Sequence, residues 1–122
     1  MQRFLKLLIA VVTMSSAVDT AAFAHAFLDH AVPGVGLEVS GSPRELRLYF
    51  TQGVVTAFSG VSVTSDGGAS IPCGRPVNDP SDQQIVIVRL GHALNPGTYT
   101  VSWHVVSVDT HPTQGTFHFT VS

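Results

Sequence analysis

Three segments of this chain alternate between apolar and polar residues, and this period of two restricts the fold more than any other feature of the sequence. From residue 98 to residue 105 every odd-numbered residue is apolar and every even-numbered residue is polar, and residues 46–51 and 116–121 show a similar pattern. Successive side chains of a β-strand point to opposite faces of the sheet, so each segment predicts a strand with one buried face. No window shows a sustained helical period. The pattern therefore indicates an all-β fold.

Further strands and turns complete a predicted sandwich. Residues 85–90 form a short apolar run, which is typical of a strand buried on both faces. Asp66-Gly67-Gly68 and Asn95-Pro96-Gly97 are turn signals between the segments. The count reaches about seven strands, as in an immunoglobulin-like β-sandwich. The shorter expected strands lie near residues 26–30, 36–39 and 61–63.

The segment after residue 72 breaks the alternation. Pro76 and Pro80 lie within residues 74–83, and because proline cannot donate a hydrogen bond to a sheet, we interpret this segment as a surface loop. Cys73 is the only cysteine of the chain, which excludes an intramolecular disulfide. We interpret its thiol as buried or simply tolerated, and not as a metal ligand. Packing must therefore supply the stability of the domain.

Residues 1–24 have the pattern of a secretory signal peptide. Basic residues open the chain, an apolar stretch follows, and Ala22-Phe23-Ala24 places small residues where a signal peptidase acts. The apolar stretch is far shorter than the roughly 20 residues that cross a bilayer. We expect cleavage after Ala24, with cleavage after Ala22 as the alternative. The mature chain is then one domain, residues 25–122, with no membrane span.

The predicted mature domain is acidic and lacks both lysine and methionine. It carries four arginines against seven acidic residues, which gives a formal charge of −3. Without a basic patch to neutralise phosphates, nucleic acid is not an expected partner. All six histidines of the chain lie after residue 24, and both methionines lie before it. This composition fits a divalent metal ion better than Cu(I).

Cleavage after Ala24 places a histidine, His25, at the new N-terminus. The α-amine and the imidazole Nδ1 of such a histidine can bind one metal ion together, in a six-membered chelate ring. An α-amine has a reference pKa of about 7.7–8.0, so Cu(II) can displace its proton near neutral pH. An internal histidine lacks this option because its backbone nitrogen belongs to an amide. His25 is thus the first candidate ligand.

Asp109 and His111 are the other candidate ligands. They lie two residues apart between the last two predicted strands, and in an extended stretch such side chains point to the same side. Pro112 biases His111 towards the extended conformation. With His25 they offer three nitrogens and one carboxylate oxygen, a set that suits tetragonal Cu(II), with Ni(II) as the alternative. Two other interpretations stay open, because Asp109 can cap a turn through its own backbone and His25 can be a frayed chain end.

The sequence resembles the CopC family of periplasmic copper-binding proteins along the whole predicted mature chain. The similarity begins at His25 and continues through residues 43–50 and 57–59. It is strongest from Gly97 to Val121, with the sequence GTYTVSWHVVSVDTHPTQGTFHFTV. The resemblance implies a seven-stranded Greek-key barrel or sandwich and one high-affinity Cu(II) ion per chain.

The resemblance also implies particular ligands and a particular setting. The ligands would be His25, through its amine and Nδ1, with Asp109 and His111. The protein would work in the periplasm, in copper resistance, storage or delivery, beside a CopD-type inner-membrane copper transporter.

This chain departs from the family pattern in three ways. Thr110 stands where the family usually has glycine, and because a β-branched residue disfavours positive φ, we expect a differently shaped loop. Gln52 replaces a glutamate that many members carry, and it offers a hydrogen bond near the site in place of a carboxylate. The methionine-rich loop of some members is absent. We therefore expect only Cu(II) to bind.

Three further histidines carry weaker signals. His104 and His118 take outward positions by alternation, and pairing Ser107 with Gly115 in a hairpin would set them opposite each other as a weak second metal site. We prefer to interpret them as solvated surface residues. For His30 we expect a structural role or one beside the copper ligands.

Copper binding without catalysis is the function that the sequence favours. A histidine-brace copper oxygenase also begins with a mature histidine, but Asp109 would fill the position that oxygen needs, and the small domain lacks insertions for a substrate platform. A plain immunoglobulin-like structural domain is the third hypothesis, and it would take up no copper. We therefore predict that the protein is not an enzyme.

Overall fold

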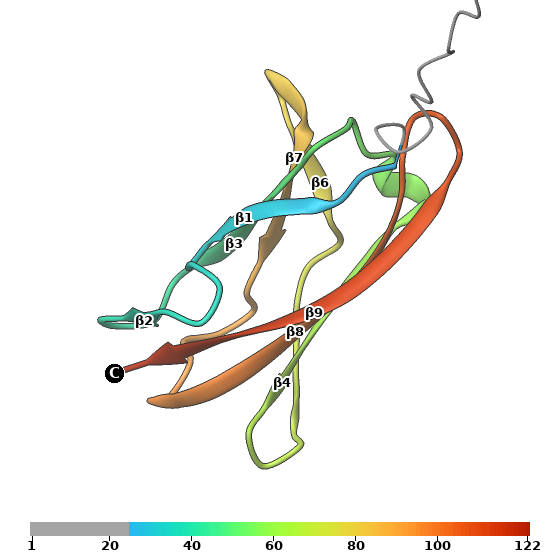
Figure 1. Ribbon diagram of the computed structural model, residues 1–122. Coiled ribbons are helices and arrows are strands. Elements are labelled where there is room, and N and C mark those ends of the chain that lie inside the picture. The colour runs from blue at the N-terminus through green and yellow to red at the C-terminus, as the bar shows by residue number, and fades with distance from the viewer. Residues whose placement is uncertain (1–24) are drawn as a thin grey trace, which may run out of the picture.

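Two β-sheets pack face to face in the computed structural model, which describes residues 25–122 (Figure 1). The first sheet has the order β1-β3-β7-β6, with β1 (Leu28–Val32), β3 (Glu45–Phe50), β7 (Asp82–Arg89) and β6 (Val77–Asp79). The second has the order β2-β9-β8-β4-β5, with β2 (Glu38–Val39), β9 (Pro112–Val121), β8 (Gly97–Val106), β4 (Gly60–Ser65) and β5 (Ser70–Ile71). Strand β2 runs parallel to β9, and the other pairs are antiparallel. The predicted all-β sandwich is confirmed, whereas the predicted signal peptide lies outside the described residues.

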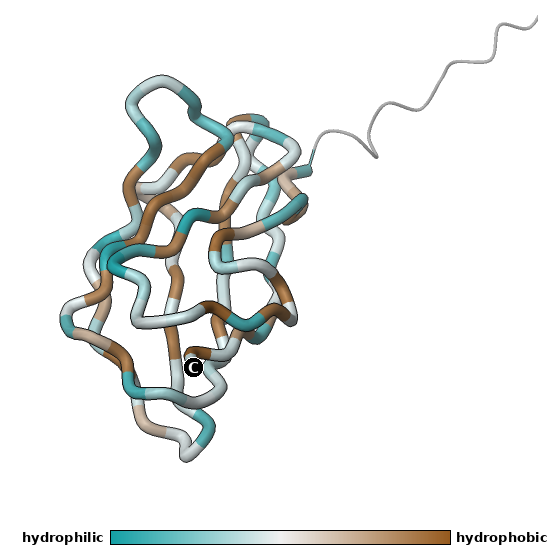
Figure 2. The backbone as a smooth tube through the Cα atoms, turned by 90° about the vertical axis from the view of Figure 1, so that its left-hand side faces the viewer, coloured by the Kyte–Doolittle hydropathy of each residue, from teal (hydrophilic) through white to brown (hydrophobic). Residues whose placement is uncertain are grey.

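The core lies between the sheets, on the faces that the alternation predicted. In β8 the odd-numbered residues from 99 to 105, and in β9 those from 117 to 121, are all at most 7% exposed. Each large apolar side chain buried in this way contributes about 1.5–3 kcal/mol. Phe50 of the first sheet meets Trp103 of the second edge to face, with ring centroids 5.1 Å apart. Figure 2 shows that hydrophobic and hydrophilic stretches follow one another along the backbone.

The apolar run at residues 85–90 predicted a strand buried on both faces, and within it residues 86–88 are buried whereas Arg89 is exposed. Ile87 lies between Arg47 of β3 and Val77 of β6 in the sheet. The prediction of a surface loop at residues 74–83 was wrong, since this segment contains β6 and the start of β7. Pro76 and Pro80 flank β6 and do not interrupt it, and β6 is an edge strand, where proline is tolerated. The structure contains two strands, β5 and β6, that were not among the roughly seven predicted from the sequence.

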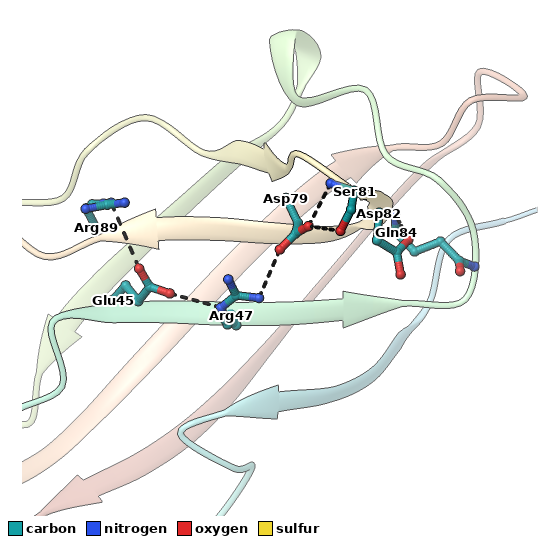
Figure 3. Close-up of polar contacts among 7 residues, drawn as sticks. All are labelled: Glu45, Arg47, Asp79, Ser81, Asp82, Gln84 and Arg89. Carbon is teal, nitrogen blue, oxygen red and sulfur yellow. Dashed lines mark hydrogen bonds and ion pairs between the residues drawn. The ribbon is translucent and has the colours of Figure 1, made fainter.

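Ion pairs connect the strands on the outer face of the first sheet (Figure 3). Arg47 Nε lies 2.9 Å from Glu45 Oε2, and its Nη1 lies 3.2 Å from Asp79 Oδ2. The backbone N–H and the hydroxyl of Ser81 both donate to Asp79 Oδ1 and, with help from Arg47, hold the pKa of Asp79 below its ordinary value. Partly exposed pairs of this kind add little stability. The pair between Arg47 and Asp79 links β3 to the end of β6 across β7.

The register of the β8–β9 hairpin differs from the predicted one. Trp103 lies opposite Gly115, and residues 107–111 join the two strands. The predicted pairing of Ser107 with Gly115 was wrong, because the Ser107 N–H donates to the His111 carbonyl at 3.0 Å and closes a tighter turn. His104 and His118 consequently lie four residue pairs apart along the outer face, about 13 Å at the rise of a β-strand. They are exposed surface histidines and cannot share one metal ion.

Gly115→Ala is expected to destabilise the protein by about 2 kcal/mol, because the added methyl group overpacks the core. A Cβ at this position would lie 2.6 Å from Trp103 Cζ2, and that ring is held by Phe50. Urea unfolding measures the change, with Gly67→Ala as the control, since a Cβ at Gly67 meets nothing within 4 Å. Equal midpoints for the two variants would contradict the described packing.

Candidate metal centre

Three segments that are distant in sequence meet at one end of the sandwich (Figure 1). They are the first described residues, the segment around the 3-10 helix η2 (Thr56–Phe58), and residues 107–111 between β8 and β9, which we call the site loop. The Val55 N–H donates to the Val106 carbonyl at 2.8 Å, and Val54 forms an isolated bridge with Ser107. The site loop therefore stands on a fixed backbone frame.

Two threonine hydroxyls hold the backbone of residues 25–27 against this frame. The Thr51 hydroxyl donates to the His25 carbonyl at 3.2 Å and accepts from the Phe27 N–H at 3.0 Å. The Thr113 hydroxyl donates to the carbonyl of Ala26 at 2.6 Å, and Ala26 itself is fully buried. The backbone carbonyl of His25 is therefore held in place beside the site loop.

The structure brings His25, Asp109 and His111 together. One candidate ligand atom of each residue lies within 4.8 Å of those of the other two. The rings of His25 and His111 have centroids 4.5 Å apart at an angle of 77°. Asp109 Oδ2 lies 3.2 Å from His111 Nδ1, although this contact lacks the alignment of a hydrogen bond. Within residues 25–122, no other group of three or more metal-ligating side chains gathers in this way.

Two atoms of this cluster are buried and lack a hydrogen-bond partner. They are Nδ1 of His25 and Oδ2 of Asp109. A buried polar atom without a partner is costly, and most such atoms in proteins are satisfied. Both atoms can donate to a metal ion, and both belong to residues whose candidate ligand atoms lie within 4.8 Å of one another. The donor set, imidazole nitrogen with carboxylate oxygen, therefore fits a divalent transition metal ion.

The charge of Asp109 is stabilised in place. The hydroxyl of Ser107 donates to Asp109 Oδ1, and this bond is the main reason that the pKa of Asp109 is lowered, with His111 as a second cause and partial burial opposing both. The carboxylate therefore stays ionised at neutral and mildly acidic pH. It supplies the negative charge that a divalent cation requires.

The site loop is a turn and not the extended stretch that we expected. Thr110 has φ = 73°, the only positive φ among the non-glycine residues that the structure describes. Its N–H donates to the Ser107 carbonyl at 2.8 Å, and its hydroxyl donates to the Asp109 carbonyl. These bonds hold a β-branched residue in the conformation that glycine favours, so the expectation that Thr110 would avoid positive φ was wrong. Asp109 and His111 meet because the chain reverses here.

The other singled-out residues lie outside the cluster. His30 stacks on Tyr49, with ring centroids 4.1 Å apart, which is a structural role. Cys73 is a half-buried free thiol packed against the core, and burial raises its pKa. Gln52 is half-buried and directly follows Thr51, which holds the first described residues.

The described part of the chain contains no helix long and apolar enough to cross a membrane.

Sequence reasoning missed Ser107, Thr51 and Thr113. Ser107 is the one buried polar residue among those that the structure describes. A signal was present, because Ser107 continues the inward-facing odd positions of β8, where the alternation requires an apolar residue. The two threonines gave no such signal, since threonine is common in strands.

A two-sheet β-sandwich with two histidines and one aspartate gathered at one end defines an all-β domain with a candidate metal centre. Residues 28–122 match the CopC domain family, and the chain belongs to this family, as the resemblance predicted. Protein YobA of Escherichia coli (strain K12) is 40% identical over 119 residues, which is 98% of this chain and 95% of the relative. Copper resistance protein C of Escherichia coli is 34% identical over 110 residues, 85% of this chain and 86% of the relative.

Solved structures of the family share the fold. PcoC, a methionine-rich copper resistance protein from Escherichia coli, has a TM-score of 0.74 and 29% sequence identity, and the match covers 81% of this chain and all of PcoC. CopC from Methylosinus trichosporium OB3b has a TM-score of 0.75 and 28% identity, and the match covers 80% of this chain and 94% of that protein.

Thr110→Gly is expected to stabilise the metal-free protein by about 1 kcal/mol. Relief of the left-handed strain is worth roughly 1–3 kcal/mol, and the extra freedom of glycine in the unfolded chain offsets part of it. Thr116→Gly, at an exposed position of β9 without positive φ, should instead destabilise. Urea unfolding midpoints compare the two variants. A loss of stability in Thr110→Gly as large as in the control would show that Thr110 is not strained.

Proposed function

We propose that this protein is a periplasmic Cu(II)-binding protein that acts in copper resistance, storage or delivery, and that it is not an enzyme. The observation that carries the proposal is the pair of buried, unpartnered donor atoms in the cluster of His25, Asp109 and His111. Relatives named copper resistance protein C, and the copper resistance protein PcoC among the solved structures, support the metal and the process.

Removal of residues 1–24 as a signal peptide would complete the site. It frees the α-amine of His25, which then joins Nδ1 of the same residue, one nitrogen of His111 and an oxygen of Asp109. Three nitrogens and one carboxylate oxygen are donors that Cu(II) accepts in a tetragonal arrangement, and the Irving–Williams order favours Cu(II) over other divalent ions. One ion per chain follows, since residues 25–122 hold one such cluster.

The anchoring of residues 25–27 makes the site ready for the ion. Thr51 and Thr113 fix the backbone on either side of Ala26, so His25 loses little conformational freedom when it binds the metal. Binding and transfer of the ion, to a CopD-type inner-membrane transporter, is the role that we propose.

Carrier function is favoured over oxygenase chemistry by the position of Asp109. One carboxylate oxygen of Asp109 lies within 4.8 Å of a ring nitrogen of each histidine, so it would occupy a metal position that an oxygenase leaves open. Copper-loaded protein with ascorbate should therefore produce no more peroxide than free copper does. Sustained turnover well above that of free copper would favour the oxygenase.

Electron paramagnetic resonance of the exported protein with one equivalent of Cu(II) is expected to show a tetragonal spectrum with three nitrogen donors. His111→Ala should reduce the count to two and weaken binding more than about 100-fold, beyond the usual effect of a residue that only supports a ligand. His111 is exposed, so the fold should persist. His118→Ala, an exposed histidine outside the cluster, is the control. A nitrogen count that stays at three in His111→Ala would refute its assignment.

A glycine added before His25 in the mature protein is expected to weaken Cu(II) binding by orders of magnitude. The addition turns the amine of His25 into an amide, which no longer binds the ion together with Nδ1. Competition titration against a chelator measures the affinity, and a glycine added after Ser122 is the control. Mass spectrometry of the exported protein first establishes that it begins at residue 25. Equal affinity in both extended proteins would exclude the amine as a ligand.

A further inference from the structure

Ser107 is the one fully buried polar side chain in the described chain, and it borders the candidate metal centre. Its exposed fraction is 0%, and it follows β8 at an inward-facing position. Burial of a hydroxyl is unfavourable unless the hydroxyl is hydrogen-bonded. An apolar residue would satisfy the alternation of β8 at lower cost. The contacts of this hydroxyl therefore explain why a serine stands here.

The proton of the Ser107 hydroxyl goes to the carboxylate of Asp109. Asp109 Oδ1 and the His111 carbonyl oxygen both lie within hydrogen-bond distance of the hydroxyl, the latter at 3.2 Å. The His111 carbonyl already accepts the Ser107 N–H at 3.0 Å. A bond to a carboxylate is charge-assisted and roughly twice as strong as one to a neutral acceptor. The hydroxyl oxygen in turn accepts the His111 N–H at 3.3 Å.

Because of this bond, the two carboxylate oxygens of Asp109 have different surroundings. Oδ1 is held by Ser107, whereas Oδ2 has no hydrogen-bond partner and lies on the side of His111, 3.2 Å from its Nδ1. A carboxylate without this restraint can rotate and present both oxygens to one ion. With the restraint, Oδ2 is the oxygen that lies beside His111.

We propose that Ser107 is a positioning residue for the metal, and that its hydroxyl restricts Asp109 to binding through Oδ2 alone. The inference rests on the proposed function, because it assigns a role within the same site. A single carboxylate oxygen keeps the number of donors at four, the number that a tetragonal Cu(II) site requires. Ser107 acts on the ion through Asp109 and does not touch it.

Ser107→Ala is expected to weaken Cu(II) binding about 10–100-fold, the usual effect of removing a group that supports a metal ligand. Its electron paramagnetic resonance spectrum should differ from that of the unchanged protein, since the released carboxylate can bind through both oxygens. Ser59→Ala is the matched control. The Ser59 hydroxyl donates to the Val55 carbonyl and accepts the Val106 N–H, near the same end of the sandwich, without contacting Asp109. This control should leave affinity and spectrum unchanged.

A double-mutant cycle separates positioning from a general effect on the fold. In an Asp109→Ala background the hydroxyl has no carboxylate to hold, so adding Ser107→Ala should change the Cu(II) affinity less than about twofold. A tenfold loss in that background would overturn the inference, because the hydroxyl would then act through the backbone. Equal affinity and equal spectra for Ser107→Ala and the unchanged protein would overturn it as well.

Failure of this inference is distinguishable from failure of the proposed function. If the unchanged protein gives no tetragonal Cu(II) spectrum, the proposed function is wrong. If it gives that spectrum and Ser107→Ala gives the same one, only the role of Ser107 is wrong. Circular dichroism checks the fold of each variant. Should Ser107→Ala not fold, Ser107→Thr keeps the hydroxyl and should retain the original spectrum, and a spectrum with an added oxygen donor in that folded variant would contradict the proposal.

Discussion

The hydrogen bond from the Ser107 N–H to the His111 carbonyl is the constraint on which the candidate metal centre depends. It closes the β8–β9 hairpin after Val106 and Pro112, the last pair of the ladder. The register of both long strands follows from this closure, because a shift along a ladder changes every cross-strand pair. The same bond places Asp109 at the middle of the site loop and His111 at its end.

The second half of the site comes from the other end of the chain. Ala26 and Thr113 are 87 positions apart in sequence, and the hydrogen bond between them joins the first described residues to the start of β9. Bringing such distant segments together lowers the chain entropy, and the favourable folding of the whole sandwich offsets this loss. The core between β3, β8 and β9 therefore does more than stabilise the domain. It holds His25 beside the site loop before any ion arrives.

The sequence allowed the sandwich, most of its core and the three candidate ligands to be predicted, because strand alternation and residue type are local properties. Leu46 and Phe119, for example, are buried as their positions indicated. The register of the last hairpin was not predictable from alternation, since a shift by an even number of residues leaves the same faces buried. It was decided by the backbone bonds of Ser107. Strand β6 was missed because proline-bounded edge strands are short and lack a periodic pattern.

Local rules of sequence and structure are broken mainly around this one site. Thr110 takes a left-handed backbone conformation, Ser107 occupies a position suited to an apolar residue, and the cluster retains two buried donor atoms without partners. Each departure is unfavourable in the metal-free protein, and natural sequences keep such departures where function requires them. All of them share one turn with Asp109 or lie against it. The departures therefore gather at the turn that brings Asp109 beside the two histidines.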